Sequence, residues 1–107
     1  MNIGIVLNSN ELETVWNAFR FGVEALDKGH KVKLFLLGKG VECEGLQSEK
    51  FNTQRTIGAF KKRGGILLAC GTCLKIRDKE ESGICSVSTM DDMLNLVVES
   101  DKVMTFG

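Results

Sequence analysis

The chain has 107 residues, enough for one hydrophobic core but too few for two. Its 14 basic side chains balance 14 acidic ones, so the charge does not favour nucleic acid or an anionic membrane as a partner. No apolar stretch approaches the length of a membrane span, and the chain opens directly into strand-like sequence. We therefore expect one cytoplasmic domain over residues 1–107. In that compartment its four cysteines are expected to be free, catalytic or metal-bound rather than disulfide-linked.

Short apolar runs alternate with helical stripes along the chain. The expected strands cover about residues 2–7, 31–37, 66–69, 84–87 and 102–106, and the expected helices cover about 12–26, 48–63, 74–77 and 90–98. This alternation predicts an α/β domain with a mostly parallel sheet and helices on both of its faces.

Helix ends are marked by capping residues and glycines. Asn10, with Glu13 three residues later, is expected to cap the first helix, and Gly29 is expected to end it. Ser88 or Thr89 is expected to cap the last helix. The apolar stripe of that last helix consists of Met90, Met93, Leu94, Val97 and Val98.

The most informative motif is Cys70-Gly71-Thr72-Cys73, which follows the apolar run of residues 66–69. The run is typical of a buried strand, and the Gly-Thr pair is typical of a tight turn into a helix. A thiol at that junction faces backbone N–H groups and the positive end of a helix, and both favour the nucleophilic thiolate. We therefore expect Cys70 to be a low-pKa nucleophile, and Cys73 to resolve a disulfide or persulfide formed on it. The alternative is that Cys70 is a small buried apolar residue.

Two other classes of protein use a CxxC pair. A thioredoxin-like dithiol is disfavoured because the motif follows the third strand, the chain has no proline, and no aromatic residue precedes Cys70. A four-thiolate metal site would need Cys43 and Cys85 as well, and these are single and distant in the sequence. We therefore expect no metal and no other cofactor.

Other polar residues and cysteines are less informative. Cys43 follows the second strand and is either a further thiol of the same pocket or an exposed loop residue. Asn8 follows the first strand and either lines the crevice or only forms a turn. Cys85 is expected to be buried, and His30 is expected on the edge of the sheet opposite Cys70.

The sequence resembles the DsrE/DsrF-like (YchN-like) sulfur-relay family, in its CGTC-type branch. The resemblance spans essentially the whole chain. It rests on the segments 8–10, 35–41, 69–77 and 100–106, of which the cysteine turn followed by Arg77 is the most specific. The chain departs from the common pattern in having Asp78 where a glycine is frequent and Lys39 where an aspartate is frequent.

This resemblance implies a three-layer α/β/α domain with a five-stranded parallel sheet, assembled into trimers or hexamers. It also implies that Cys70 accepts persulfide sulfur and passes it to the next protein of a relay, with sulfur donor and acceptor proteins as partners. The implied activity is that of a sulfur carrier or sulfurtransferase. Gly71, Thr72, Asn8 and Cys43 are expected around the two cysteines. A non-catalytic module that binds a ligand or partner, or a CxxC dithiol redox protein, are the alternatives.

Overall fold

A computed structural model describes residues 1–79 and 85–107. Strands and helices alternate along the chain, as expected. The elements are β1 (Asn2–Leu7), α1 (Leu12–Asp27), β2 (Lys31–Leu36), the 3₁₀-helical segment η1 (Gly38–Gly45), α2 (Thr53–Lys62), β3 (Ile66–Cys70), α3 (Gly71–Ile76), β4 (Ser86–Ser88), α4 (Met90–Glu99) and β5 (Lys102–Phe106).

The five strands form one sheet in the order β4-β3-β2-β1-β5. Every neighbouring pair is parallel, and the register pairs Ile5 of β1 with Leu34 of β2 and with Met104 of β5. The carboxyl ends of all five strands therefore lie along the same side of the sheet, which we call the carboxyl edge. In open parallel sheets, this is the edge at which ligands bind.

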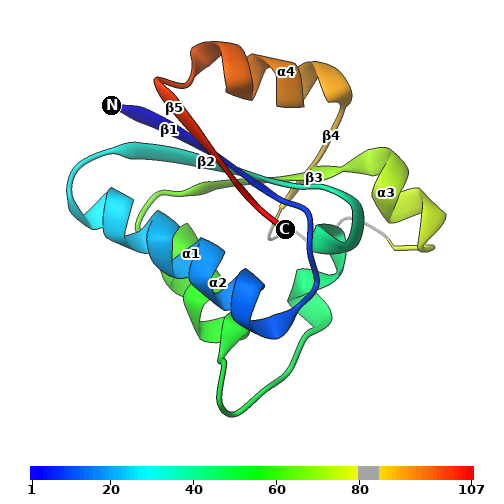
Figure 1. Ribbon diagram of the computed structural model, residues 1–107. Helices are drawn as coiled ribbons and strands as arrows, with labels where there is room; N and C mark the ends of the chain where they lie inside the picture. Colours follow the sequence, from blue (N-terminus) through cyan, green and yellow to red (C-terminus); the bar gives the residue numbers. More distant parts are fainter. Residues whose placement is uncertain (80–84) are drawn as a thin grey trace.

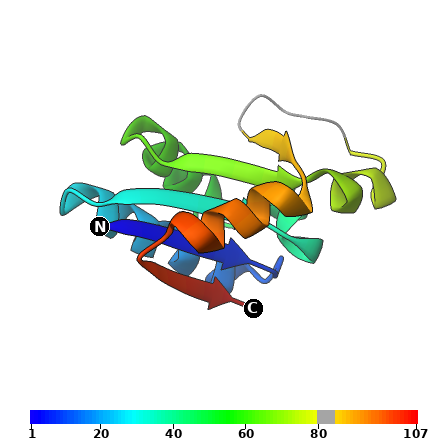
Figure 2. The same cartoon turned by 90° about the horizontal axis from the view of Figure 1, so that it is seen from above.

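Helices cover both faces of the sheet, which gives three layers (Figure 1). From β1 to β3 the chain moves in one direction, and α1 and α2 lie together on one face. It continues to the edge strand β4 and then returns across the sheet to β5, and α4 lies on the opposite face (Figure 2). Right-handed crossovers require this change of face whenever the direction reverses.

The main core lies between the sheet and the layer formed by α1 and α2. Ile5, Leu7, Leu34, Leu36 and Leu67 are buried there together with residues of the two helices. Phe19 of α1 and Phe60 of α2 meet edge to face, with 5.5 Å between ring centroids. Burying apolar surface contributes about 25 cal/mol per Å². This layer therefore provides most of the driving force that holds the carboxyl edge in place.

Most of the apolar stripe expected on the last helix faces away from the core. Only Leu96 of α4 is fully buried, and Met93 packs partly against the core. Exposed side chains include Met90, Leu94, Val97 and Val98, of which Val98 is 72% exposed. These side chains are exposed because the contact side of α4 is narrow. It is centred on Leu96, which packs over Gly4 of β1.

Several element boundaries also differ from the expected ones. Glu11 caps α1 in place of Asn10, because its carboxylate accepts the N–H groups of Glu13 and Thr14 at 2.9 and 3.0 Å. Helix α2 begins after Asn52 rather than at Ser48, whose hydroxyl instead accepts the N–H of Phe51 and closes a turn.

The second half of the chain shows similar shifts. Helix α3 begins at Gly71, three residues before the expected start, so that Cys73 is helical. Strand β4 begins at Ser86, and Ile84, its expected first residue, lies outside the described residues. The expected cap of α4 is confirmed at Thr89, which forms a reciprocal capping box with Asp92.

Candidate functional site

The two cysteines of the CGTC motif lie together at the carboxyl end of β3. Cys70 is the last residue of β3 and also the N-cap of α3. Its Sγ accepts a hydrogen bond from the backbone N–H of Cys73, with 3.4 Å between nitrogen and sulfur. Cys73 lies in the first turn of α3. The structure thus brings both thiols to the carboxyl edge of the sheet.

Cys70 is neither exposed nor low in pKa, contrary to expectation. Only 3% of the residue is exposed. Burial raises the pKa of the Cys70 thiol, and its hydrogen bond with the Cys73 side chain raises it further; the N–H groups of Cys73 and Thr72 act in the opposite direction. Helix α3 has only six residues, and so few aligned peptide dipoles cannot outweigh the burial of the sulfur.

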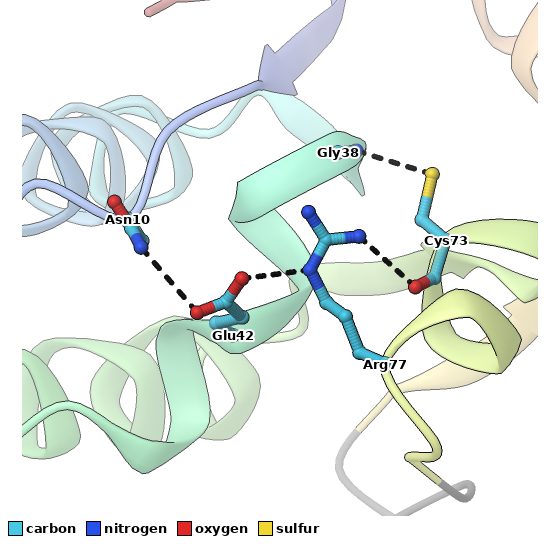
Figure 3. Close-up of polar contacts among 5 residues, drawn as sticks. All are labelled: Asn10, Gly38, Glu42, Cys73 and Arg77. Atoms are coloured by element: carbon cyan, nitrogen blue, oxygen red, sulfur yellow. Dashed lines mark hydrogen bonds and ion pairs between the residues drawn. The ribbon is translucent and has the colours of Figure 1, made fainter.

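Cys73 is half-buried and reaches a different segment. Its Sγ accepts a hydrogen bond from the N–H of Gly38, the first residue of η1, with 3.3 Å between nitrogen and sulfur (Figure 3). Gly38 has a φ of 55°, and a Cβ at this position would lie 2.3 Å from the side-chain oxygen of Asn8. A glycine is therefore required where η1 meets the cysteine pair.

An ion pair joins α3 to η1 beside the cysteines (Figure 3). Nε of Arg77 lies 2.7 Å from the carboxylate of Glu42, and its Nη1 donates to the carbonyl of Cys73 at 3.1 Å. The side-chain amide of Asn10 donates to the other oxygen of Glu42 at 3.4 Å. The hydrogen bond with Arg77, and then the one with Asn10, lowers the pKa of Glu42. These contacts therefore link the segment before α1, η1 and the end of α3 at the carboxyl edge.

Sequence reasoning did not find Glu42. The sequence showed that Arg77 follows the cysteine turn, but it gave no partner for this residue. The available signal was that Asn10 and Glu42 follow neighbouring parallel strands, whose carboxyl ends must meet. A carboxylate in a loop is common, however, and only the turn of η1 directs this one toward α3.

Cys43 and Cys85 form a second, buried pair. Cys43 is on η1 but fully buried, so it is not the exposed loop residue considered above. Its pKa is raised to about 12, first by burial and then by the nearby Glu44 and Cys85. Cys85 is 6% exposed, and its Sγ donates to the Glu44 carboxylate at 3.4 Å. The expected burial of Cys85 is confirmed.

The remaining expected site residues lie around the cysteine turn. Gly71 packs against β4, where an added Cβ would be 3.0 Å from Val87. Thr72 is exposed, and its N–H points to the sulfur of Cys70. Asn8 is exposed, and its side chain meets Gly38. His30 lies at the opposite edge, where its Nδ1 is 2.9 Å from the N-terminal amine.

The described part of the chain offers neither a metal cluster nor a membrane-spanning helix. Among residues 1–79 and 85–107, no group of three or more His, Cys, Asp or Glu side chains is arranged to hold a metal ion. Within the same residues, no helix is long and apolar enough to cross a membrane.

Comparison with known sequences identifies the family. The model of the DsrE/DsrF-like family matches residues 1–106. The chain belongs to the DsrE/DsrF-like family. Two archaeal relatives are similar to it. The protein MJ0989 of Methanocaldococcus jannaschii is 34% identical over 100 residues, which cover 88% of both chains. The protein MK0008 of Methanopyrus kandleri is 33% identical, over 88% of this chain and 83% of the relative. Both relatives are described as uncharacterized proteins.

A solved structure supports the fold of this DsrE/DsrF-like chain. The conserved protein of unknown function BT1422 from Bacteroides thetaiotaomicron superposes with a TM-score of 0.79, over 98% of this chain and 94% of that one. The two sequences are only 16% identical, so the similarity shows the fold alone. The three-layer α/β architecture with five parallel strands is thus confirmed.

Proposed function

We propose that this protein is a small cytoplasmic sulfur carrier that holds sulfane sulfur as a persulfide on the Cys70–Cys73 pair and transfers it between partner proteins. The observation that carries the proposal is that each sulfur of the pair accepts a backbone N–H. Cys70 accepts from Cys73, and Cys73 accepts from Gly38. Hydrogen bonds from amides stabilise sulfur anions, both thiolate and persulfide.

The chemistry of this proposal needs only thiols. A thiolate attacks the outer sulfur of a donor persulfide, and the donor leaves as a thiol. The rate of such an exchange depends on the thiolate fraction, on access and on the leaving group. Gly71 and Thr72 lie between the two cysteines in the sequence, and Asn8 contacts Gly38, so we expect a donor or acceptor to contact these residues. Cys43 is fully buried and lies outside this route.

The test is to load the protein and locate the added sulfur. The reduced protein is incubated with glutathione persulfide, alkylated and analysed by mass spectrometry. We expect one added sulfur in the peptide of residues 64–75, which trypsin releases after Arg63 and Lys75 and which contains both cysteines. The fully buried Cys43 is the internal control and is expected to stay unlabelled. A protein that takes no sulfur on either cysteine of the pair would refute the carrier function.

We also propose that the protein assembles into a homo-oligomer, a trimer or hexamer, through α4. The proposal is supported by the outward apolar stripe of Met90, Leu94, Val97 and Val98. An exposed stripe at this helical spacing is typical of a helix that packs against another copy. Light scattering of the Val98→Lys variant is expected to show smaller particles than the wild type, and Glu99→Gln beside it serves as a control. A wild type that is monomeric at micromolar concentration would contradict this proposal.

This surface also favours the alternative function, a non-catalytic binding module. In that case Cys70→Ser would bind partners normally, and the cysteine pair would react with a persulfide no faster than a free thiol. The carrier function predicts the opposite result in the assay with persulfide.

A further inference from the structure

We propose that Cys73 is the thiol that first receives sulfur from the donor, and that Cys70 takes it over from Cys73 and holds it away from solvent. This inference rests on the proposed carrier function and adds an order to it. It reverses the order expected from the sequence, in which Cys70 attacks the donor.

The two cysteines differ in their access to a donor. A thiolate must approach a persulfide along the axis of the sulfur–sulfur bond, so a donor has to come into direct contact with it. Cys70 is 3% exposed, whereas Cys73 is half-buried. Cys70 caps α3 from within the strand end, and Cys73 lies beyond it, on the helix itself. A donor therefore meets Cys73 first.

Cys73 is also held in a fixed position. Cys73 is held by η1 at two points, as Figure 3 shows. Its Sγ accepts the N–H of Gly38, and its carbonyl accepts from Arg77, whose guanidinium is bound to Glu42 of η1. These contacts fix both the sulfur and the backbone of one residue. A nucleophile held in one orientation reacts faster, because less conformational freedom is lost on the way to the transition state.

The surroundings of Cys70 suit a residue that stores the transferred sulfur as a persulfide. Its sulfur accepts the N–H of Cys73, which ties the two residues together across one turn. Burial that makes Cys70 a poor first nucleophile also keeps an attached sulfur away from water and from competing thiols. Burial raises the pKa of the Cys70 thiol, in agreement with the same division of roles.

Both steps balance without an oxidant or reductant. In the first, the Cys73 thiolate attacks the outer sulfur of the donor R–S–SH. A bond forms between Cys73 Sγ and that sulfur, the donor sulfur–sulfur bond breaks, and the leaving thiolate takes the proton that Cys73 lost. In the second, the Cys70 thiolate attacks the outer sulfur of the Cys73 persulfide. Cys70 then carries the persulfide, and Cys73 leaves as a thiolate that takes the proton lost by Cys70.

The test is a time course of loading with glutathione persulfide, quenched by alkylation. Fragmentation of the peptide of residues 64–75 between Gly71 and Thr72 assigns the added sulfur to Cys70 or Cys73. In the wild type we expect sulfur on Cys73 at the earliest times and on Cys70 later. In Cys70→Ser, Cys73 is expected to load and to retain the sulfur. In Cys73→Ser, the loading rate of Cys70 is expected to fall at least about tenfold.

The outcomes separate this inference from the function on which it rests. Sulfur on Cys70 before Cys73 in the wild type, or wild-type loading of Cys70 in Cys73→Ser, would overturn the order but leave the carrier function intact. Absence of sulfur from both cysteines of the wild type would refute the function itself, and the order with it. The wild-type time course decides the order even if one variant does not fold. Cys43→Ala is the matched control and is expected to load like the wild type.

Discussion

The pair formed by Cys70 and Cys73 and the pair formed by Cys43 and Cys85 have opposite electrostatic partners. In the first pair, each sulfur accepts a backbone N–H. In the second, Cys85 donates to the carboxylate of Glu44, and the same carboxylate raises the pKa of Cys43. N–H donors favour a sulfur anion, whereas a carboxylate and burial favour the neutral thiol. Proximity of two cysteines in a fold therefore does not by itself indicate reactivity.

The largest predicted difference concerns the reaction of Cys43 with iodoacetamide. Its pKa of about 12 lies three units above the ordinary value of 9.0. At neutral pH its thiolate fraction, and with it the alkylation rate, is therefore expected to be about a thousandfold lower in the folded than in the unfolded protein. Peptide mapping after a short pulse checks this expectation. Rapid labelling of Cys43 in the native protein would remove the contrast between the two pairs.

The same shift has a consequence for stability. The folded state holds the proton of Cys43 more tightly than the unfolded state does, because the pKa is raised in the folded state. The stabilisation is complete below the unfolded pKa and decreases as pH rises from about 9 toward 12. Denaturant unfolding at several pH values is expected to show this decrease, with a shallower slope in Cys43→Ala. Equal slopes in the two proteins would contradict the assigned pKa.

The contact of Gly38 with the sulfur of Cys73 is the next target. Gly38→Ala places a Cβ in the left-handed region and against Asn8, and it is expected to cost at least about 1–2 kcal/mol of unfolding free energy. Gly45→Ala at the other end of η1 is the matched control, because an added Cβ there meets nothing within 4 Å. If urea unfolding shows equal effects of the two substitutions, Gly38 is not a constrained position.

The pair of Cys70 and Cys73 also differs from the other two cysteines in having the ion pair between Arg77 and Glu42 beside it. Arg77→Met releases the carbonyl of Cys73, and we expect the loading of Cys73 with persulfide to slow by about tenfold. Lys75→Met is the control, since Lys75 is exposed on the same helix.

The ion pair with Arg77 also makes stability depend on pH. Because the pKa of Glu42 is lowered in the folded state, the stabilising contribution of Glu42 is present above its unfolded pKa and is lost as pH falls through its folded pKa. The stability difference between wild type and Arg77→Met is therefore expected to decrease in acid.

The smallest effect is expected at Asp78, which follows the site. Asp78 has a φ of 52°, in the left-handed region that favours glycine. Asp78→Gly relieves the left-handed strain and is expected to raise stability by about 0.5–1 kcal/mol. Thermal unfolding measures the change, and Asp91→Gly in the first turn of α4 should destabilise by a similar amount. A loss of stability in Asp78→Gly would show that its side chain has a structural role.

The sequence by itself determined the α/β fold, four of the five strands closely, and the place of the cysteine turn. Apolar runs such as residues 31–37 and 66–69 are bounded by glycines and charged residues, and these signals are local. Capping was predictable at Thr89 because the reciprocal hydrogen bonds lie within four residues. The capping prediction failed at Asn10, because the side chain of Asn10 binds a distant partner, Glu42.

Only the tertiary structure decided which side chains are buried and what they contact. The outward face of α4 depends on where the helix crosses β1, and the burial of Cys70 depends on the layers packed around the end of β3. The contacts of Cys73 with Gly38, and through Arg77 with Glu42, join residues 35 positions apart in the sequence. The spacing of two cysteines can indicate that they meet, but the solvent access and hydrogen-bond donors around each sulfur arise from the packing of distant segments.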